Sequence, residues 1–73
     1  MTETIKAGIY RHYKGQLYEV LGMARHSETE EILIVYRALY GEYGLWVRPA
    51  AMFAETVTFN SETLPRFAPV AVF

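Results

Sequence analysis

The chain has to build a stable core from 73 residues without a single cysteine, and this requirement limits its fold more than any other feature. Domains this short bury a small share of their surface, and disulfides or sulfur-bound metals are the usual supports, which this chain cannot form. It carries instead six Tyr, four Phe and one Trp, and each ring buries a large area. We therefore expect one domain over residues 1–73, ordered at about 8–67, with most rings inward.

Charge and hydropathy exclude several classes of protein. The formal net charge of −1 argues against a general affinity for nucleic acid or anionic lipid, which needs an excess of basic residues. Residues 1–6 lack the apolar stretch of a secretory signal peptide, and no apolar run is long enough to cross a membrane. We expect a cytoplasmic protein without membrane contact.

Strand and turn signals alternate along the chain and predict a small all-β barrel of about five strands. Pro49 followed by an alanine-rich segment predicts one short helical turn at 49–55. β-branched and aromatic residues predict strands at 8–13, 16–25, 32–40, 45–48 and 56–59, with a short last edge strand at 65–67.

The two longest predicted strands also suggest a register. If opposed residue numbers sum to 56, Glu19 meets Arg37, and Tyr18 and Tyr36 lie on the same face. A slip of one residue would set Arg37 against Val20 and leave Glu19 unpaired, so we predict the even register along the whole hairpin.

The C-terminal segment 68–73 is apolar and nearly free of polar groups. It is able to pair along an exposed strand of its own domain or of a neighbour, and the alternative is that it frays as termini commonly do. Both faces of the predicted hairpin are rather apolar. A further alternative is therefore a structural role. The protein would form a weak homodimer or dock onto a partner chain through an uncovered face of the sheet.

Several short runs of the sequence form a recognisable set, among them Tyr18-Glu19-Val20-Leu21-Gly22, Val35-Tyr36-Arg37-Ala38-Leu39-Tyr40, Trp46-Val47-Arg48-Pro49 and Pro65-Arg66-Phe67. In these runs the chain resembles a bacterial family, the domain of unknown function 1653. The resemblance covers about 8–67 and implies a small SH3-like β-barrel with no established activity, ligand or cofactor. The chain departs from the family pattern at Ala50-Ala51, where a larger apolar residue and an acid are usual, and at Asn60-Ser61.

Most kinds of catalytic site are absent from the sequence. The chain contains no Asp and no Cys, so Ser-His-Asp and Cys-His arrangements are not available, and no glycine-rich phosphate loop occurs. We expect no cofactor. His12 and His26 end successive predicted strands, and with Glu28 they would supply two imidazoles and a carboxylate for a metal or for acid–base catalysis. The alternative is that one histidine caps a loop and the other is solvated.

Arginines interleaved with aromatic rings indicate a second kind of site. Arg recognises carboxylates and phosphates with two parallel donors and stacks on rings, and small β-barrels use such faces to hold peptides or single-stranded nucleic acid. The alternative is that the arginines are solvated strand residues, with Arg37 paired to Glu19. A non-enzymatic binding module for an anionic or aromatic ligand is the predicted function. Its candidate residues are Tyr10, His12, Lys14, His26, Arg37, Trp46, Arg48 and Arg66.

Overall fold

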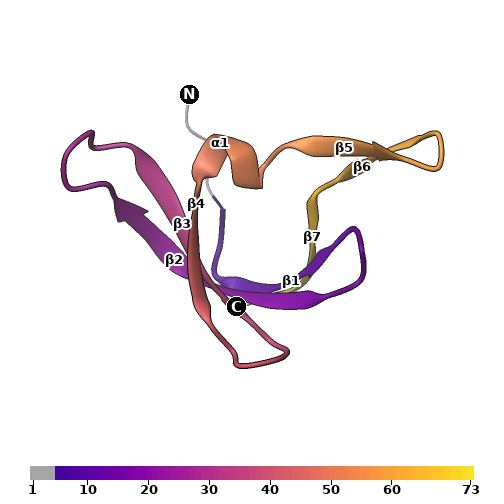
Figure 1. Ribbon diagram of the computed structural model, residues 1–73, viewed down its shortest axis with the longest axis horizontal. Helices are drawn as coiled ribbons and strands as arrows, with labels where there is room; N and C mark the ends of the chain where they lie inside the picture. The colour runs from indigo at the N-terminus through magenta and orange to yellow at the C-terminus, as the bar shows by residue number, and fades with distance from the viewer. Residues whose placement is uncertain (1–4) are drawn as a thin grey trace.

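The computed structural model describes residues 5–73 and consists almost entirely of strands (Figure 1). This confirms the all-β prediction. There are more strands than the five or so expected, because the region predicted to hold one edge strand at 65–67 holds two. In chain order the elements are β1 (Gly8–His12), β2 (Leu17–Arg25), β3 (Ile32–Ala38), β4 (Leu45–Pro49), α1 (Ala50–Phe53), β5 (Thr56–Phe59), β6 (Glu62–Pro65) and β7 (Phe67–Val72).

Five of the strands form one antiparallel sheet in the order β4-β3-β2-β1-β7, and β5 pairs with β6 in a separate hairpin. The edge strands β4 and β7 do not pair with each other, so the sheet curves without closing through hydrogen bonds. The predicted barrel is therefore open. The predicted helical turn is confirmed as α1, which lies with the β5–β6 hairpin across from the β1–β2 hairpin (Figure 1). Within residues 5–73 no helix could span a bilayer, since α1 is a single turn.

Aromatic rings fill the space between the sheet and α1. Phe53 of α1 stacks on Phe67 of β7 with ring centroids 4.2 Å apart, and Tyr10 meets Phe53 edge-on at 5.6 Å. The buried core consists of Tyr10, Val20, Ile34, Tyr36, Ala50, Phe53 and Phe67.

Fewer rings lie inward than the sequence suggested. Tyr13 and Tyr18 are half-buried, and five rings are exposed because they lie on an edge strand, in turns or at the C-terminus: Tyr40, Tyr43, Trp46, Phe59 and Phe73.

The register of the β2–β3 hairpin agrees with the prediction at one end only. Opposed numbers sum to 56 from Tyr18 to Val20, so Glu19 does face Arg37. Beyond Val20 the register shifts, Gly22 faces Val35, and the outer half pairs with a sum of 57. The predicted pairing of that half was wrong because a β-bulge inserts one residue into β2. A bulge increases the local twist of the strands, and side-chain pairing rules do not predict where a bulge occurs.

The C-terminal segment pairs with β1 as β7, which confirms the pairing alternative and extends the ordered part beyond residue 67. Beyond β7, the N–H of Phe73 donates to the carbonyl oxygen of Ala7 at 3.0 Å. Gly8 permits the close approach of the two strands: a Cβ built there would overlap the Ala71 carbonyl oxygen and lie 2.9 Å from the Val72 Cα.

We expect Gly8→Ala to lower the free energy of unfolding by about 1–3 kcal/mol, because β7 would have to move away from β1. Urea denaturation followed by circular dichroism measures this change. Gly44→Ala is the matched control, since a Cβ there meets only the Trp46 side chain at 3.6 Å, an ordinary contact. Equal stability of the two variants would contradict the role assigned to Gly8.

Candidate functional site

A pocket of about 240 Å³ opens on the inner face of the sheet near the end of β3. Tyr36 and Trp46 are direct cross-strand neighbours, and Arg48 lies two residues after Trp46, on the same face of β4. Tyr18 of β2 meets Tyr36 edge-on with ring centroids 5.5 Å apart. The pocket is lined by Tyr18, Tyr36, Tyr40, Trp46 and Arg48.

Arg48 is held in place by two aromatic side chains. Its Nε donates to the Tyr36 hydroxyl oxygen at 3.4 Å, and its guanidinium carbon lies 5.9 Å from the centre of the Phe67 ring. Its side chain makes no ion pair with any carboxylate of residues 5–73. Arg48 is therefore a half-buried, positioned cation whose charge no acidic group of that segment balances.

Two other arginines are paired with acids. Arg25 reaches Glu30 at 3.5 Å in the β2–β3 loop region, where both side chains are exposed. Arg66, between β6 and β7, reaches Glu55 at 3.5 Å. Arg48 differs from both because it faces the pocket and meets rings rather than carboxylates.

The Tyr18 hydroxyl at the pocket stays protonated well above neutral pH. The Tyr18 and Tyr40 hydroxyls are hydrogen-bonded to each other at 2.7 Å. Burial, this hydrogen bond and the nearby Tyr40 and Tyr36 phenols raise the pKa of Tyr18 to about 12, against the opposing effect of Arg48. The pocket therefore holds the neutral hydroxyl of Tyr18 close to the guanidinium of Arg48.

Further basic groups surround this pocket. Burial first, then the charges of Arg66, Lys14 and Arg48, lower the pKa of His12, which favours its neutral form. The Nδ1 of His12 accepts the backbone N–H of Lys14 at 3.2 Å, and its ring packs edge-on against Phe67 at 5.0 Å. Arg66, Lys14 and Arg48 therefore lie near one another around His12, although the net charge of the chain is −1.

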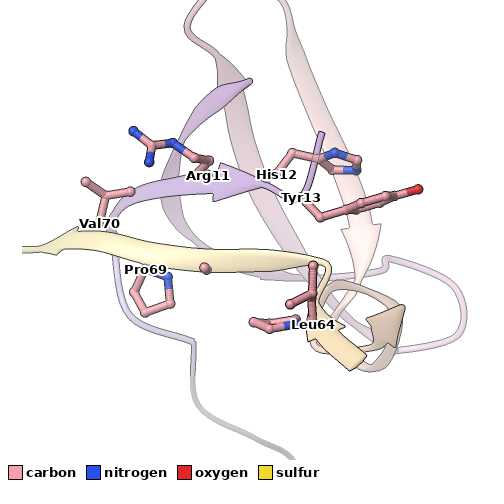
Figure 2. A pocket seen from close by; sticks show the side chains of 8 residues that line it. Arg11, His12, Tyr13, Leu64, Pro69 and Val70 are labelled. Atoms are coloured by element: carbon pink, nitrogen blue, oxygen red, sulfur yellow. The ribbon is translucent and has the colours of Figure 1, made fainter. Parts of the chain in front are cut away.

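A second pocket, of about 250 Å³, lies where β1 meets β6 and β7 (Figure 2). Figure 2 shows Arg11 and Val70 at one end of it, with His12 and Tyr13 at the other. Most of its wall is apolar, and Arg11 is exposed to solvent. It therefore lacks the combination of a positioned cation and hydroxyl donors that the first pocket has. Its lining is Arg11, His12, Tyr13, Leu64, Pro65, Ala68, Pro69 and Val70.

The structure divides the eight predicted binding residues into separate groups. Trp46 and Arg48 line the first pocket, while His12, Lys14 and Arg66 lie close enough together for both cations to shift the His12 pKa. Three tyrosines of the pocket were missed because the rings were expected to be structural. The signal that could have found two of them is the predicted register, which already placed Tyr18 and Tyr36 on one face.

Three predicted residues lie elsewhere and need correction. Tyr10 is 7% exposed in the core, where its hydroxyl donates to the Lys6 carbonyl oxygen at 2.8 Å, so it is not available for stacking on a ligand. Arg37 follows Tyr36 directly on β3 and therefore lies on the opposite face of the sheet from the pocket. His26 belongs to the β2–β3 loop, where its Nδ1 accepts the backbone N–H groups of Glu28 and Thr29.

The structure does not bring His12 together with His26 and Glu28, which the enzymatic alternative requires. β1 and β2 are antiparallel neighbours, so the end of β1 lies beside the start of β2, and His26 follows the other end. From Leu17 to Arg25, β2 extends roughly 26 Å at about 3.3 Å for each of its eight steps, and the two histidines lie near opposite ends of it. Within residues 5–73 no cluster of three histidine or acidic side chains could hold a metal ion.

The fold and the site define a small antiparallel β domain with an aromatic pocket around one arginine. The sequence matches the family described as "Protein of unknown function (DUF1653)" over residues 8–69, and the chain belongs to this family. The chain is similar to a protein of that family from Bordetella bronchiseptica, whose crystal structure is known. The two share 39% identity with a TM-score of 0.89, covering 100% of this chain and 96% of the other. No protein with a curated description matches the chain.

The pKa of Tyr18 predicts how stability depends on pH. An unfolded tyrosine ionises near pH 10, whereas folded Tyr18 keeps its proton to about pH 12. This group therefore leaves the free energy of unfolding unchanged below pH 10 and lowers it as the pH rises from 10 towards 12. Tyr10, whose pKa burial also raises, contributes to the same decline.

We expect Tyr18→Phe to make that decline shallower than in the wild type. Urea unfolding at a series of pH values on both sides of 10 measures the slope. Tyr43→Phe is the control, because Tyr43 is 58% exposed in a turn. The assignment fails if the Tyr18 variant and the wild type lose stability equally with rising pH.

Proposed function

We propose that the protein is a non-enzymatic binding module whose pocket at Arg48 receives an anionic group of its ligand. One observation carries the proposal: Arg48 faces the pocket with its Nε bonded to Tyr36 and no carboxylate of residues 5–73 paired with its charge. A half-buried arginine in that position gains free energy from an anion that accepts its remaining N–H groups.

The chemistry of the pocket favours a carboxylate or phosphate. Only the Nε of Arg48 is used by Tyr36, and the terminal N–H groups of a guanidinium match two oxygens of such an anion. The Tyr36 hydroxyl accepts from Arg48, so its own proton remains available to donate. The indole of Trp46 is 58% exposed beside these donors and supports stacking of a flat group attached to the anion.

The observations favour binding over the enzymatic alternative. The acid–base site needed His12, His26 and Glu28 together, and the antiparallel β1–β2 pairing separates the histidines. Burial first, and then the charges of Arg66, Lys14 and Arg48, lower the pKa of His12 and disfavour its protonated form. Basic side chains near Arg48 instead add attraction for an anion at a distance.

The single tryptophan makes the proposal simple to test, because all indole fluorescence comes from the pocket. We expect benzoate and phenyl phosphate to change the Trp46 fluorescence in a saturable way. Benzamide has a similar ring and no charge, and it should bind more weakly by about tenfold or more, the difference between charged and neutral hydrogen bonds.

Arg48→Gln should weaken benzoate binding by about tenfold or more, because it removes the cation and keeps a polar side chain of similar reach. Arg37→Gln is the matched control: it neutralises an arginine of the adjoining strand on the opposite face. Circular dichroism verifies that both variants fold. Equal affinities of the two variants for benzoate, or no saturable change in the wild type, would rule out the proposed pocket.

A further inference from the structure

The two edges of the five-stranded sheet are protected to very different degrees. β7 contains Pro69, which has no backbone N–H, and its pairing with β1 is interrupted by a bulge. Both devices discourage the addition of another strand. β4 pairs with β3 in one unbroken register, and its only proline, Pro49, is the last residue of the strand. Its first three side chains are apolar and mostly exposed, at 58% for Leu45, 58% for Trp46 and 59% for Val47.

The hydrogen-bonding pattern shows which backbone groups of β4 have no partner among residues 5–73. Just before β4, the carbonyl oxygen at position 44 accepts the N–H of Ala38 at 3.0 Å. Bonded positions alternate in an antiparallel pair, so the backbone groups of Trp46 and Arg48 point toward β3. Leu45 and Val47, which alternate with these positions, direct their N–H and C=O groups away from the sheet. The next outward position is Pro49, which has no N–H to donate, so the edge offers both kinds of group only at Leu45 and Val47.

This free backbone edge lies directly beside the pocket. The side chains of Trp46 and Arg48 line the pocket from β4, while those at positions 45 and 47 lie on the other face of the sheet. A strand added to β4 would place alternate side chains on the pocket face, with Cβ atoms about 4.5–5.5 Å from those of its neighbours. The edge and the cation are thus parts of one surface.

We propose that β4 accepts an extended peptide segment of a partner protein as an additional strand, with an acidic side chain of that segment on Arg48. This inference rests on the proposed anion pocket and names its ligand. The added backbone exchanges hydrogen bonds with Val47, and the acidic residue gives specificity, as in other cases of strand addition to a sheet edge.

The geometry also sets the order of side chains in the partner. For an antiparallel added strand, the residue paired with Val47 carries an apolar side chain on the outer face. The residue before it faces Arg48 and is acidic, and the residue after it faces Trp46 and is aromatic or apolar. The recognised segment therefore contains an acidic, an apolar and an aromatic residue in succession.

Charge complementarity favours such a segment over a second copy of this chain. Pairing two β4 strands would bring the Arg48 of each copy to the same seam, and β4 contains no acidic residue to balance them. β7, the other edge strand, also contains no acidic residue. Neither edge strand of the five-stranded sheet of a second copy would therefore supply a carboxylate to Arg48, which has none paired with it among residues 5–73.

The test uses a seven-residue peptide with blocked ends and a central Glu-Val-Tyr triplet between Thr and Lys residues. It contains no tryptophan, so Trp46 fluorescence follows its binding to the full chain, and amide hydrogen exchange by NMR locates it. We expect exchange at Leu45 and Val47 to slow by about tenfold or more at saturation, since both amides become hydrogen-bonded.

Two altered peptides separate the contributions of backbone and charge. N-methylation of the central valine removes the N–H that bonds to Val47, and we expect about tenfold weaker binding or more. Replacing Glu by Gln should weaken binding by a similar factor in the wild type and have little effect in Arg48→Gln. Val47→Pro removes the outward-pointing N–H of β4 itself, and this variant should still bind benzoate. The N-methylated peptide removes the opposite donor of the same residue pair and leaves the protein unchanged.

The outcomes distinguish the added strand, the anion pocket and a second copy of the chain. Benzoate binding without peptide-induced protection at Leu45 and Val47 overturns the added strand and leaves the anion pocket standing. Protection by the peptide with equal affinity for its Glu and Gln forms and no benzoate binding overturns the pocket instead, and with it the acidic ligand proposed here. Concentration-dependent protection of the same amides without peptide, together with a dimer in sedimentation, identifies a second copy as the occupant and overturns the peptide.

Discussion

The ring of Phe67 joins the core of the protein to its candidate site. On one side it stacks on Phe53 at 4.2 Å, which fixes α1 against β7. On the other it lies 5.9 Å from the Arg48 guanidinium and meets Tyr18 and Tyr36 edge-on at 5.5 and 5.7 Å. A buried ring in this position excludes water from beneath the arginine and supplies its negative face to the cation. The position of Arg48 therefore depends on the same packing that holds the domain together.

The small size of the domain explains why core and site share residues. A chain of 73 residues has few side chains to spare, so rings such as Tyr36 serve both purposes: the ring is 5% exposed in the core, and its hydroxyl accepts from Arg48. Side chains alternate between the two faces of a strand, so Tyr36 of β3 and both Trp46 and Arg48 of β4 lie on the same face of the sheet. The opposite face, which carries Arg37, is separated from the site by the thickness of the sheet.

Much of the fold could be predicted from the sequence because its signals are local. The strands at β2, β3, β4 and β5, the helical turn after Pro49 and the Glu19–Arg37 register follow from residue type and spacing. The β-bulge after Val20 could not be predicted, because it depends on how β2 bends around the core. The two-residue turn at Asn60 and Ser61, with positive φ of 52° and 65°, likewise takes its form only from the pairing of β5 with β6.

For the site, the residue types were predictable and their arrangement was not. The sequence alone determined that arginines and aromatic rings, rather than Asp or Cys chemistry, are the available means of recognition, and it singled out Trp46 and Arg48. Tertiary structure decided that Tyr10 is buried, that His26 lies far from His12 and that Arg48 has no carboxylate partner within residues 5–73. The physical reason is that composition and alternation act along one strand, whereas burial and charge balance depend on which strands become neighbours.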